Sequence, residues 1–485
     1  MITYLLMSIL QSAQAGEASV GGYFRVMTRP DLQGGSGRLG YWNLYGRLLN
    51  EGPYATLDFR YSILEQAPDN RTWTRLHARI EGGSIGTADM ANGSLDQFRL
   101  SQTYVLAGNV LFPNVVWQLG TLDTYFGDLG LYDMRPAQIF FESVGLSGRY
   151  QTDKMELLLG VGDSGYWIRR QDYNNIPTIG GTFRYRPVSG LEIGFGGQYR
   201  YEAAIAGNQA APYSTPGVDY EDYIRQEVVR NYLLENPFRV LEFPDPELDA
   251  AASGKGIGYL GFGGFGPVIW NNLYVSYERL HPQGPTKENF QGDDYQIHVT
   301  SLTDERTVLI VGNELQLRII PEKWDIAWGM LFGDHTDLDN TISPTENDRV
   351  YYSTVLRNQF YLTPVMHLLI EGSAAQEVSK QGNMFREHAD SIFANTSGVS
   401  DIEGLEYGDT DTRYTFQGKG GIVLNPLGPG IFTRPSLRLL YGIQYSNQNN
   451  AFGNRFVETL NQYNEFGNVE QHIHQLIALE TEAWF

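Results

Sequence analysis

The chain ends in a stretch that decides its fold class, Asn468–Phe485, which reads NVEQHIHQLIALETEAWF. Side chains alternate between the two faces of a β-strand, so every second residue shares a face. One face carries mostly apolar side chains, namely Ile473, Ile477, Leu479, Thr481, Ala483 and Phe485. The other face carries Leu476, Ala478, Glu480, Glu482 and Trp484. This pattern suits a strand with lipid on one side and water on the other. A half-buried strand of a soluble sheet alternates in the same way.

Further segments of about 10 residues alternate similarly, and this is the length that a tilted strand needs to cross a bilayer. The clearest are Val20–Thr28, Tyr41–Leu49, Asn272–Tyr277 and Arg434–Tyr441. An arginine that faces lipid at mid-bilayer costs about 2–4 kcal/mol. The arginine-bearing faces of these segments are therefore predicted to line the lumen of a barrel.

The connections between these segments alternate in length. Short ones carry Pro or Gly, as in Asn50–Pro53 and Asn425–Pro429, whereas Gln66–Asp96 and Glu202–Ser253 are long. Short turns on one side and long loops on the other are typical of outer-membrane barrels. The count predicts an all-β, antiparallel transmembrane barrel of 18 strands, with both termini on the periplasmic side. It assigns two strand-like stretches to loops, Thr72–Gly82 and Tyr295–Leu302; if both were wall strands, the barrel would have about twenty.

Composition excludes several classes of protein. The 485 residues show no linker or change in composition, which predicts a single domain, and no segment has the roughly 20 apolar residues of a membrane helix. A net charge of −21 argues against nucleic-acid binding, and it is compatible with cation attraction into a pore. The chain has no cysteine and therefore no disulfide framework.

The N-terminus resembles an export signal. An apolar core, Ile2–Leu10, precedes the small-x-small sequence Ala13-Gln14-Ala15. We predict a signal peptide over residues 1–15, a single barrel domain over 16–485 and location in the bacterial outer membrane. No Lys or Arg precedes the apolar core, which departs from the usual signal pattern, and an N-terminal core strand is the alternative.

Loops and isolated polar groups do not predict an enzyme. Residues 204–253 are predicted to form a long extracellular loop, and Tyr220–Glu242 within it has helical spacing broken by Pro237. A nucleophile, a base and an orienting acid are not found together. His472 and His474 share a strand face without an identifiable third metal ligand. We therefore predict neither catalysis nor a metal or other cofactor.

Short stretches over much of the chain resemble the maltoporins, the trimeric sugar-specific porins of bacterial outer membranes. They are Gly22–Arg25, Arg38–Gly40 with Tyr45, Phe98–Arg99 with Pro113 and Val116–Gly120, Trp324–Asp325 with Gly329–Met330, Thr363–Met366 with Glu371–Gly372, Thr433–Arg438 and Glu482–Phe485. The resemblance implies a homotrimer in the lipid bilayer and a row of aromatic residues along the lumen. Sugar rings stack on such residues through their C–H faces, while charged side chains bind the hydroxyl rim.

Residue by residue, the resemblance places Tyr23, Tyr45, Phe432 and Trp484 on this aromatic row. Strand alternation independently puts the same four side chains on the lumen face. Arg25 corresponds to a hydroxyl-binding residue of the rim. Tyr259 is a possible fifth ring, in a strand that is apolar on both faces, so that its direction is not readable.

The resemblance also implies that residues 123–138 form a constriction loop folded into the lumen. This loop offers Asp123, Tyr125, Asp128, Tyr132, Asp133 and Arg135. It carries more carboxylates than the family pattern, and Arg47 stands where the family has a carboxylate. These departures favour cations or a sugar other than maltodextrin. A general cation-preferring pore therefore stays open as an alternative to a sugar channel, as does a surface receptor or adhesin that acts through its long loops.

Overall fold

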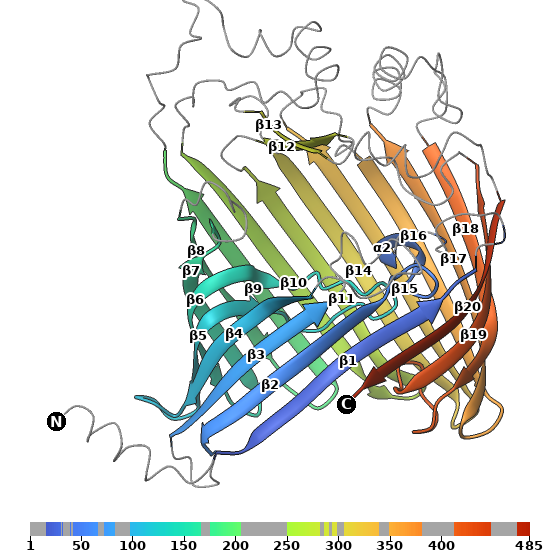
Figure 1. Ribbon diagram of the computed structural model, residues 1–485, viewed down its shortest axis with the longest axis horizontal. Helices are drawn as coiled ribbons and strands as arrows, with labels where there is room; N and C mark the ends of the chain where they lie inside the picture. Colours follow the sequence, from blue (N-terminus) through green and yellow to red (C-terminus); the bar gives the residue numbers. More distant parts are fainter. Residues whose placement is uncertain are drawn as a thin grey trace, which may run out of the picture.

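The computed structural model describes residues 16–30, 32, 39, 42–65, 72–82, 98–165, 175–204, 250–281, 286–290, 293–297, 305–338, 349–380, 412–447 and 473–485. Within these residues, eighteen strands form one antiparallel sheet and two further strands form a separate hairpin, β12–β13 (Figure 1). The elements are β1 (Ala18–Thr28), α2 (Trp42–Tyr45), β2 (Tyr54–Leu64), β3 (Trp73–Gly82), β4 (Phe98–Gly108), β5 (Val115–Thr124), β6 (Ile139–Gln151), β7 (Met155–Asp163), β8 (Pro177–Tyr185), β9 (Leu191–Glu202), β10 (Ala251–Phe265), β11 (Val268–Leu280), β12 (Thr286–Phe290), β13 (Asp293–Ile297), β14 (Arg306–Ile320), β15 (Trp324–Asp337), β16 (Arg349–Tyr361), β17 (Met366–Ser379), β18 (Thr412–Leu424), β19 (Ser436–Ser446) and β20 (Ile473–Trp484).

The sheet closes on itself into a barrel. β1 pairs with β2 on one side and with the last strand, β20, on the other, where Tyr23 lies opposite Trp484. Every other wall strand pairs with its neighbours in the chain, allowing for the hairpin between β11 and β14. Closure leaves no unpaired sheet edge, which is the condition for crossing lipid with strands. The predicted 18-stranded antiparallel barrel is confirmed.

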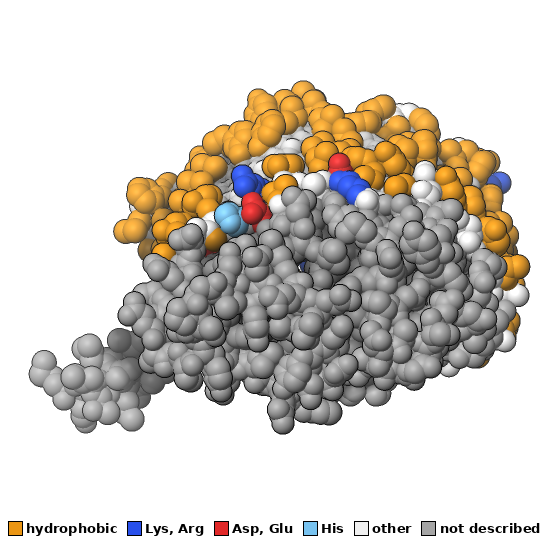
Figure 2. Space-filling model, turned by 90° about the horizontal axis from the view of Figure 1, so that it is seen from above, with side chains coloured by type: hydrophobic (Ala, Val, Ile, Leu, Met, Phe, Trp, Pro, Cys, Tyr) orange, Lys and Arg blue, Asp and Glu red, His pale blue; other side chains and the backbone are white. Residues whose placement is uncertain are grey.

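The outer surface of the wall is apolar. In β19 and β20 the side chains of Leu437, Leu439, Ile477 and Leu479 are exposed outward, while Arg438 and the others between them are buried inward. Figure 2 shows hydrophobic side chains over the visible outer wall. Exposed aromatic side chains lie toward both ends of the strands, among them Tyr61, Tyr185 and Phe265 at one end and Tyr199, Tyr277, Tyr352 and Tyr445 at the other. This is the wall of an outer-membrane β-barrel.

The connections sort by side as predicted, but two strand assignments near the N-terminus are wrong. Tyr41–Leu49 is not a wall strand: its described part holds the single turn α2 inside the connection 29–53, and Asn50–Pro53 ends that connection instead of forming a short turn. Thr72–Gly82, assigned to a loop, contains wall strand β3. The two errors offset each other, so the strand count is unchanged.

The assignment of Tyr295–Leu302 to a loop can be compared with the structure, whereas several other expectations concern residues outside the described ranges. β13 covers the start of Tyr295–Leu302 and pairs only with β12, so the described part of that stretch is not in the wall. The signal segment 1–15, the helical pattern in Tyr220–Glu242 and His472 lie outside the described residues. Among the described residues, no helix is long and apolar enough to cross a membrane.

Candidate functional site

The described residues of the connection 29–53 fold into the lumen, where residues 45–50 lie on the inner faces of β17 and β18 (Figure 1). The Tyr45 hydroxyl donates to Glu377 Oε2 at 3.0 Å, and the Lys419 ammonium donates to the Tyr45 carbonyl at 2.8 Å. The Asn50 amide donates to Gln417 at 3.1 Å. The apolar side chains of this connection explain why it lies there. Leu39, Leu48 and Leu49 pack on a cluster of inner-wall residues, namely Leu369, Val423, Leu440, Leu476 and Ala478. Burial of such side chains is the main force that holds the segment.

The predicted constriction loop, residues 123–138, begins in the structure after β5 ends at Thr124, and its residues 125–138 fold inward. The Asn272 amide on β11 donates to the Asp128 carbonyl at 3.0 Å, and Glu314 on β14 accepts from the Leu131 amide at 2.7 Å. Gly127 has a φ of +63°, and a Cβ at this position would overlap the Tyr274 hydroxyl. Glycine therefore allows the loop to approach β11 this closely. The loop's buried side chains pack against the inner faces of β10, β11 and β14–β17.

The two inward segments are joined to each other, and we name their joint the latch: Arg25, Arg47, Glu51, Asp133 and Glu482. The Arg47 amide donates to the Leu131 carbonyl at 2.8 Å, and the Arg47 guanidinium binds Glu51 at 3.0 Å and Glu482 at 3.1 Å. Arg25 pairs with Glu51 and donates to the Gly52 carbonyl at 2.7 Å. These bonds connect the connection 29–53 to the constriction loop and to strands β1 and β20.

Two carboxyl groups of the latch share a hydrogen bond, and their pKa values move apart. Burial raises the pKa of Glu51 to about 8, although Arg25 and Arg47 oppose the rise. The Asp133 side chain is exposed to the lumen but partly removed from bulk water, which opposes its ionisation. Arg47, the hydrogen bond with Glu51 and Arg25 together nevertheless hold its pKa below the ordinary range. Within this pair Glu51 therefore takes up a proton at higher pH than Asp133 does.

Inward-facing charged side chains differ sharply in exposure around the barrel. On β16, β18 and β19, the side chains of Arg357, Lys419 and Arg438 are 2%, 0% and 6% exposed. On β3, β4 and β6, those of Arg79, Arg99 and Arg149 are 31%, 36% and 38% exposed. The inward segments therefore fill the side of the lumen next to β10, β11 and β14–β20. Water reaches the arginines on β3, β4 and β6, and we name the part of the lumen lined by β2–β9 the wet passage.

Charges along the wet passage are paired. Asp58 accepts from His77 and Arg79, both at 2.8 Å. Glu81 pairs with Arg99 at 2.7 Å, and Glu156 with Arg184 at 2.7 Å. In these pairs the carboxylates are largely buried, but the arginines are partly exposed and have N–H groups left for a solute. The pairs on β16–β20 are enclosed by protein.

Two of the predicted aromatic residues lie together, and the sequence analysis missed a third. The Tyr23 ring lies 4.5 Å from the Trp484 ring and 6.0 Å from the ring of Tyr54, centroid to centroid. The Tyr23 hydroxyl donates to Glu482 at 2.9 Å, and Trp484 is largely exposed at the short-turn end of β20. Tyr54 donates to Glu81 at 3.0 Å. Tyr54 points inward because it lies opposite Arg25 in the β1–β2 pairing. The sequence analysis took Tyr41–Leu49 as the strand next to β1 and so did not place Tyr54 opposite Arg25.

The other predicted rings do not continue this row. Tyr45 is fully buried at the end of α2 and not on a strand, so the prediction from strand alternation is wrong for this residue. Phe432 lies in the turn 425–435, packs against the cluster around the constriction loop and has Arg357 5.9 Å from its ring centre. Tyr259 points inward and stacks on Tyr274 at 4.8 Å, with Phe126 edge-on at 5.4 Å. Of the four predicted rings, Tyr23 and Trp484 are thus a pair in contact, and Tyr45 and Phe432 pack elsewhere in the described lumen.

The predicted site residues Arg25 and those of the constriction loop differ in their exposure to the lumen. Arg25 is buried in the latch and is not part of an accessible rim. Tyr125 is exposed, and the Arg135 guanidinium lies 4.3 Å from its ring centre. Asp128, Asp133 and Arg135 are also exposed side chains of the loop.

The remaining two loop candidates are held by neighbours. Asp123, at the end of β5, accepts from the Gln138 amide at 2.7 Å and from the Gln102 amide at 3.3 Å. Tyr132 is fully buried, and its hydroxyl accepts from Ser353 at 3.3 Å. In the part of the chain that the structure describes, no group of three His, Asp or Glu side chains could hold a metal ion.

No protein-family model and no curated protein matches this chain, so its resemblance to the maltoporins stays a prediction. Similar solved structures include Escherichia coli Wzi, an outer-membrane protein involved in group 1 capsule assembly and a carbohydrate-binding β-barrel. Wzi is 10% identical, and the match covers 99% of this chain and 87% of that chain at a TM-score of 0.40. Pseudomonas aeruginosa OprD is 8% identical, with 98% and 97% covered and a TM-score of 0.41. Pseudomonas aeruginosa OccK1 is 7% identical, with 98% and 100% covered and a TM-score of 0.43. At these identities the likeness concerns the fold alone.

Proposed function

We propose that the chain is an outer-membrane porin through which sugars or short oligosaccharides diffuse along the wet passage, without a catalytic step. The observation that carries this proposal is the difference in exposure between the inward-facing charges of β3–β6 and those of β16–β19. A barrel that served only as a scaffold for loops would have no reason to keep one side of its lumen hydrated.

The chemistry of the wet passage favours a neutral, hydroxyl-rich solute. Arginines and carboxylates alternate in pairs, so a fixed excess of one sign does not follow from the described contacts. Sugar hydroxyls both donate and accept, and they can bridge such pairs without a change in net charge. Tyr54, Tyr125 and Trp484 add aromatic faces on which the C–H face of a pyranose can stack. Each of these side chains would contact the sugar while still partly in water, which favours weak binding and release.

In this proposal the latch and the constriction loop set the width of the passage. Tyr125 and Arg135, which are exposed and in contact with each other, form its accessible edge. From the resemblance we also propose that the barrel is a homotrimer, which cross-linking in native membranes would test.

The proposal is tested by liposome swelling with neutral sugars of increasing length and with uncharged polyols of matched size. We expect pyranose sugars to enter faster than polyols of equal mass. Substitution of Tyr125→Ala together with Arg135→Ala should reduce that preference, while Tyr352→Ala, which removes an exposed outward ring, should leave it unchanged. Flux that depends on solute size alone would reject sugar selection and favour a general pore. No flux of any solute would favour the receptor or adhesin alternative.

A further inference from the structure

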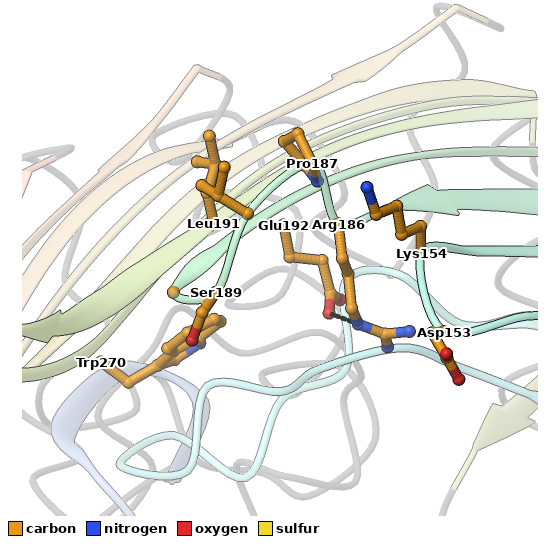
Figure 3. Close-up of a pocket in the computed structure, with 10 residues that line it drawn as sticks. Asp153, Lys154, Arg186, Pro187, Ser189, Leu191, Glu192 and Trp270 are labelled. Atoms are coloured by element: carbon orange, nitrogen blue, oxygen red, sulfur yellow. Dashed lines mark hydrogen bonds and ion pairs between the residues drawn. The ribbon is translucent and has the colours of Figure 1, made fainter.

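A cavity of about 460 Å³ opens on the inner side of the short-turn end of the barrel (Figure 3). Its lining comes from parts of the chain that are distant in sequence: the β6–β7 turn with Asp153 and Lys154, the β8–β9 turn with Arg186, and the start of strand β11 with Trp270. Glu192 completes it from the start of β9. Its volume lies in the range of small-ligand sites, roughly 300–1,000 Å³.

The indole of Trp270 is held in one orientation at one end of this cavity. Trp270 Nε1 donates to Asn272 Oδ1 at 2.6 Å, and the same oxygen accepts from the Tyr259 hydroxyl at 3.0 Å. Gly261, on β10, leaves room for the ring, because a Cβ there would lie 2.7 Å from the Trp270 ring. A fixed aromatic plane that lines a cavity is a stacking surface prepared before a ligand arrives.

Charges of both signs line the other end. Glu192 is buried and accepts from Arg186 at 2.7 Å and from Arg184 at 3.3 Å, and Figure 3 shows the Arg186–Glu192 pair across the cavity from Trp270. Asp153 and Lys154 are exposed at the rim. Two carboxylates and two cations at the cavity leave no excess charge for an anionic or cationic ligand. They offer donors and acceptors for a ring of hydroxyls.

We propose that this cavity binds one pyranose unit at the periplasmic end of the lumen, with its C–H face on Trp270 and its hydroxyls on Arg186, Glu192 and Lys154. The proposal rests on the proposed sugar function and adds a site to it, on strands other than those that carry Tyr23, Tyr54 and Trp484. Neither strand alternation nor the maltoporin resemblance pointed to Trp270. A site at this end would retain sugar units as they leave the wet passage.

The test is calorimetric titration of the full-length barrel in detergent micelles with maltose, and with sorbitol as an open-chain polyol that lacks a ring face. We expect maltose to bind more tightly than sorbitol. Loss of the indole in Trp270→Ala should weaken maltose binding about tenfold, and Trp270→Phe should weaken it less. Trp324→Ala is the matched control, since Trp324 is an indole at the same rim that packs on Phe360 and belongs to the outer face of the wall. Heat-modifiability on gels reports whether each variant is a folded barrel.

Equal maltose affinity of the wild type and folded Trp270→Ala would overturn the proposed site, as would equal binding of sorbitol and maltose. The proposed function is assessed separately by liposome swelling. Sugar-selective swelling together with unchanged binding in Trp270→Ala would reject only the cavity. Maltose binding that depends on Trp270 in a barrel without flux would retain the cavity and reject the channel.

Discussion

The latch predicts that one substitution, Arg47→Ala, opens the lumen. Arg47 is the residue that joins the connection 29–53 to both the constriction loop and β20, through its amide to Leu131 and its guanidinium to Glu51 and Glu482. Alanine keeps the backbone hydrogen bond from residue 47 to the Leu131 carbonyl and removes the ion pairs with Glu51 and Glu482. The connection 29–53 should then leave the inner wall more often.

The free-energy cost of Arg47→Ala depends on which cationic partners Glu51 and Glu482 keep in the variant. Removal of one partner from a buried ion pair costs about 3–5 kcal/mol when the other charge is left alone. Here Glu51 keeps Arg25, and Glu482 keeps Arg434 at 2.6 Å and Arg438. The loss therefore approaches that of hydrogen bonds to charged groups, about 1.5–3 kcal/mol, which is roughly a 10- to 150-fold change in the ratio of latched to released segment.

Single-channel recording in planar bilayers measures this ratio. Wild-type barrels should show a low, steady conductance, and Arg47→Ala barrels should show frequent transitions to a higher level. Arg99→Ala is the matched control, because it removes an arginine–glutamate pair of the wet passage that holds no inward segment. If Arg47→Ala and Arg99→Ala gave the same conductance levels and dwell times as the wild type, the latch would not control the lumen.

Further predictions concern the loops and the wall. The pKa of Glu51 is raised to about 8 in the latched state, so the latch has its full stability below the ordinary glutamate pKa, about 4.5, and loses stability as the pH rises to about 8. The open dwell times in single-channel recordings should therefore lengthen over this pH interval. Glu51→Gln should remove this pH dependence. Gly127→Ala should displace the constriction loop and raise the solute size limit in swelling assays, and the added change Tyr274→Phe, which removes the overlapped hydroxyl, should restore part of the wild-type limit. Leu439→Arg should lower the free energy of unfolding in urea titrations from lipid vesicles by about 2–4 kcal/mol, since its side chain faces lipid. Gln102→Arg, on the inner wall, should change that free energy by less than about 1 kcal/mol, and an equal loss in both variants would contradict the assignment of faces.

The wall was predictable where lipid imposes a strict period of two. In β19 and β20 most outward residues are apolar, so alternation alone gave the correct faces of Arg438 and Glu482. β3 alternates as well, and Pro68-Asp69-Asn70 before it is a turn sequence that could have identified it. The prediction treated β3 as part of one long loop because its connection to β2 was not recognised.

The lumen was less predictable, since protein can fill it from any direction. Leu44 and Leu48 have the spacing and hydrophobicity of a strand face, yet they are buried by the inner wall and not by lipid. Burial of an apolar side chain has a similar free energy in either place, so pattern alone does not distinguish a lumen-filling segment from a wall strand. For the same reason Tyr45 was placed on the wrong element.

The role of each inward charge depends on hydration more than on residue type. Arg357 is enclosed with Glu371 at 2.7 Å, and there removal of either partner would leave a desolvated charge, so such a pair fixes protein structure. Arg79 makes an equally short bond to Asp58, but water reaches it, and a solute hydroxyl can replace that water at little cost. A sequence shows arginine in both places. Only the position of the inward segments decides which arginines hold the loops and which remain for a solute, so the latch and the wet passage are two results of one packing arrangement.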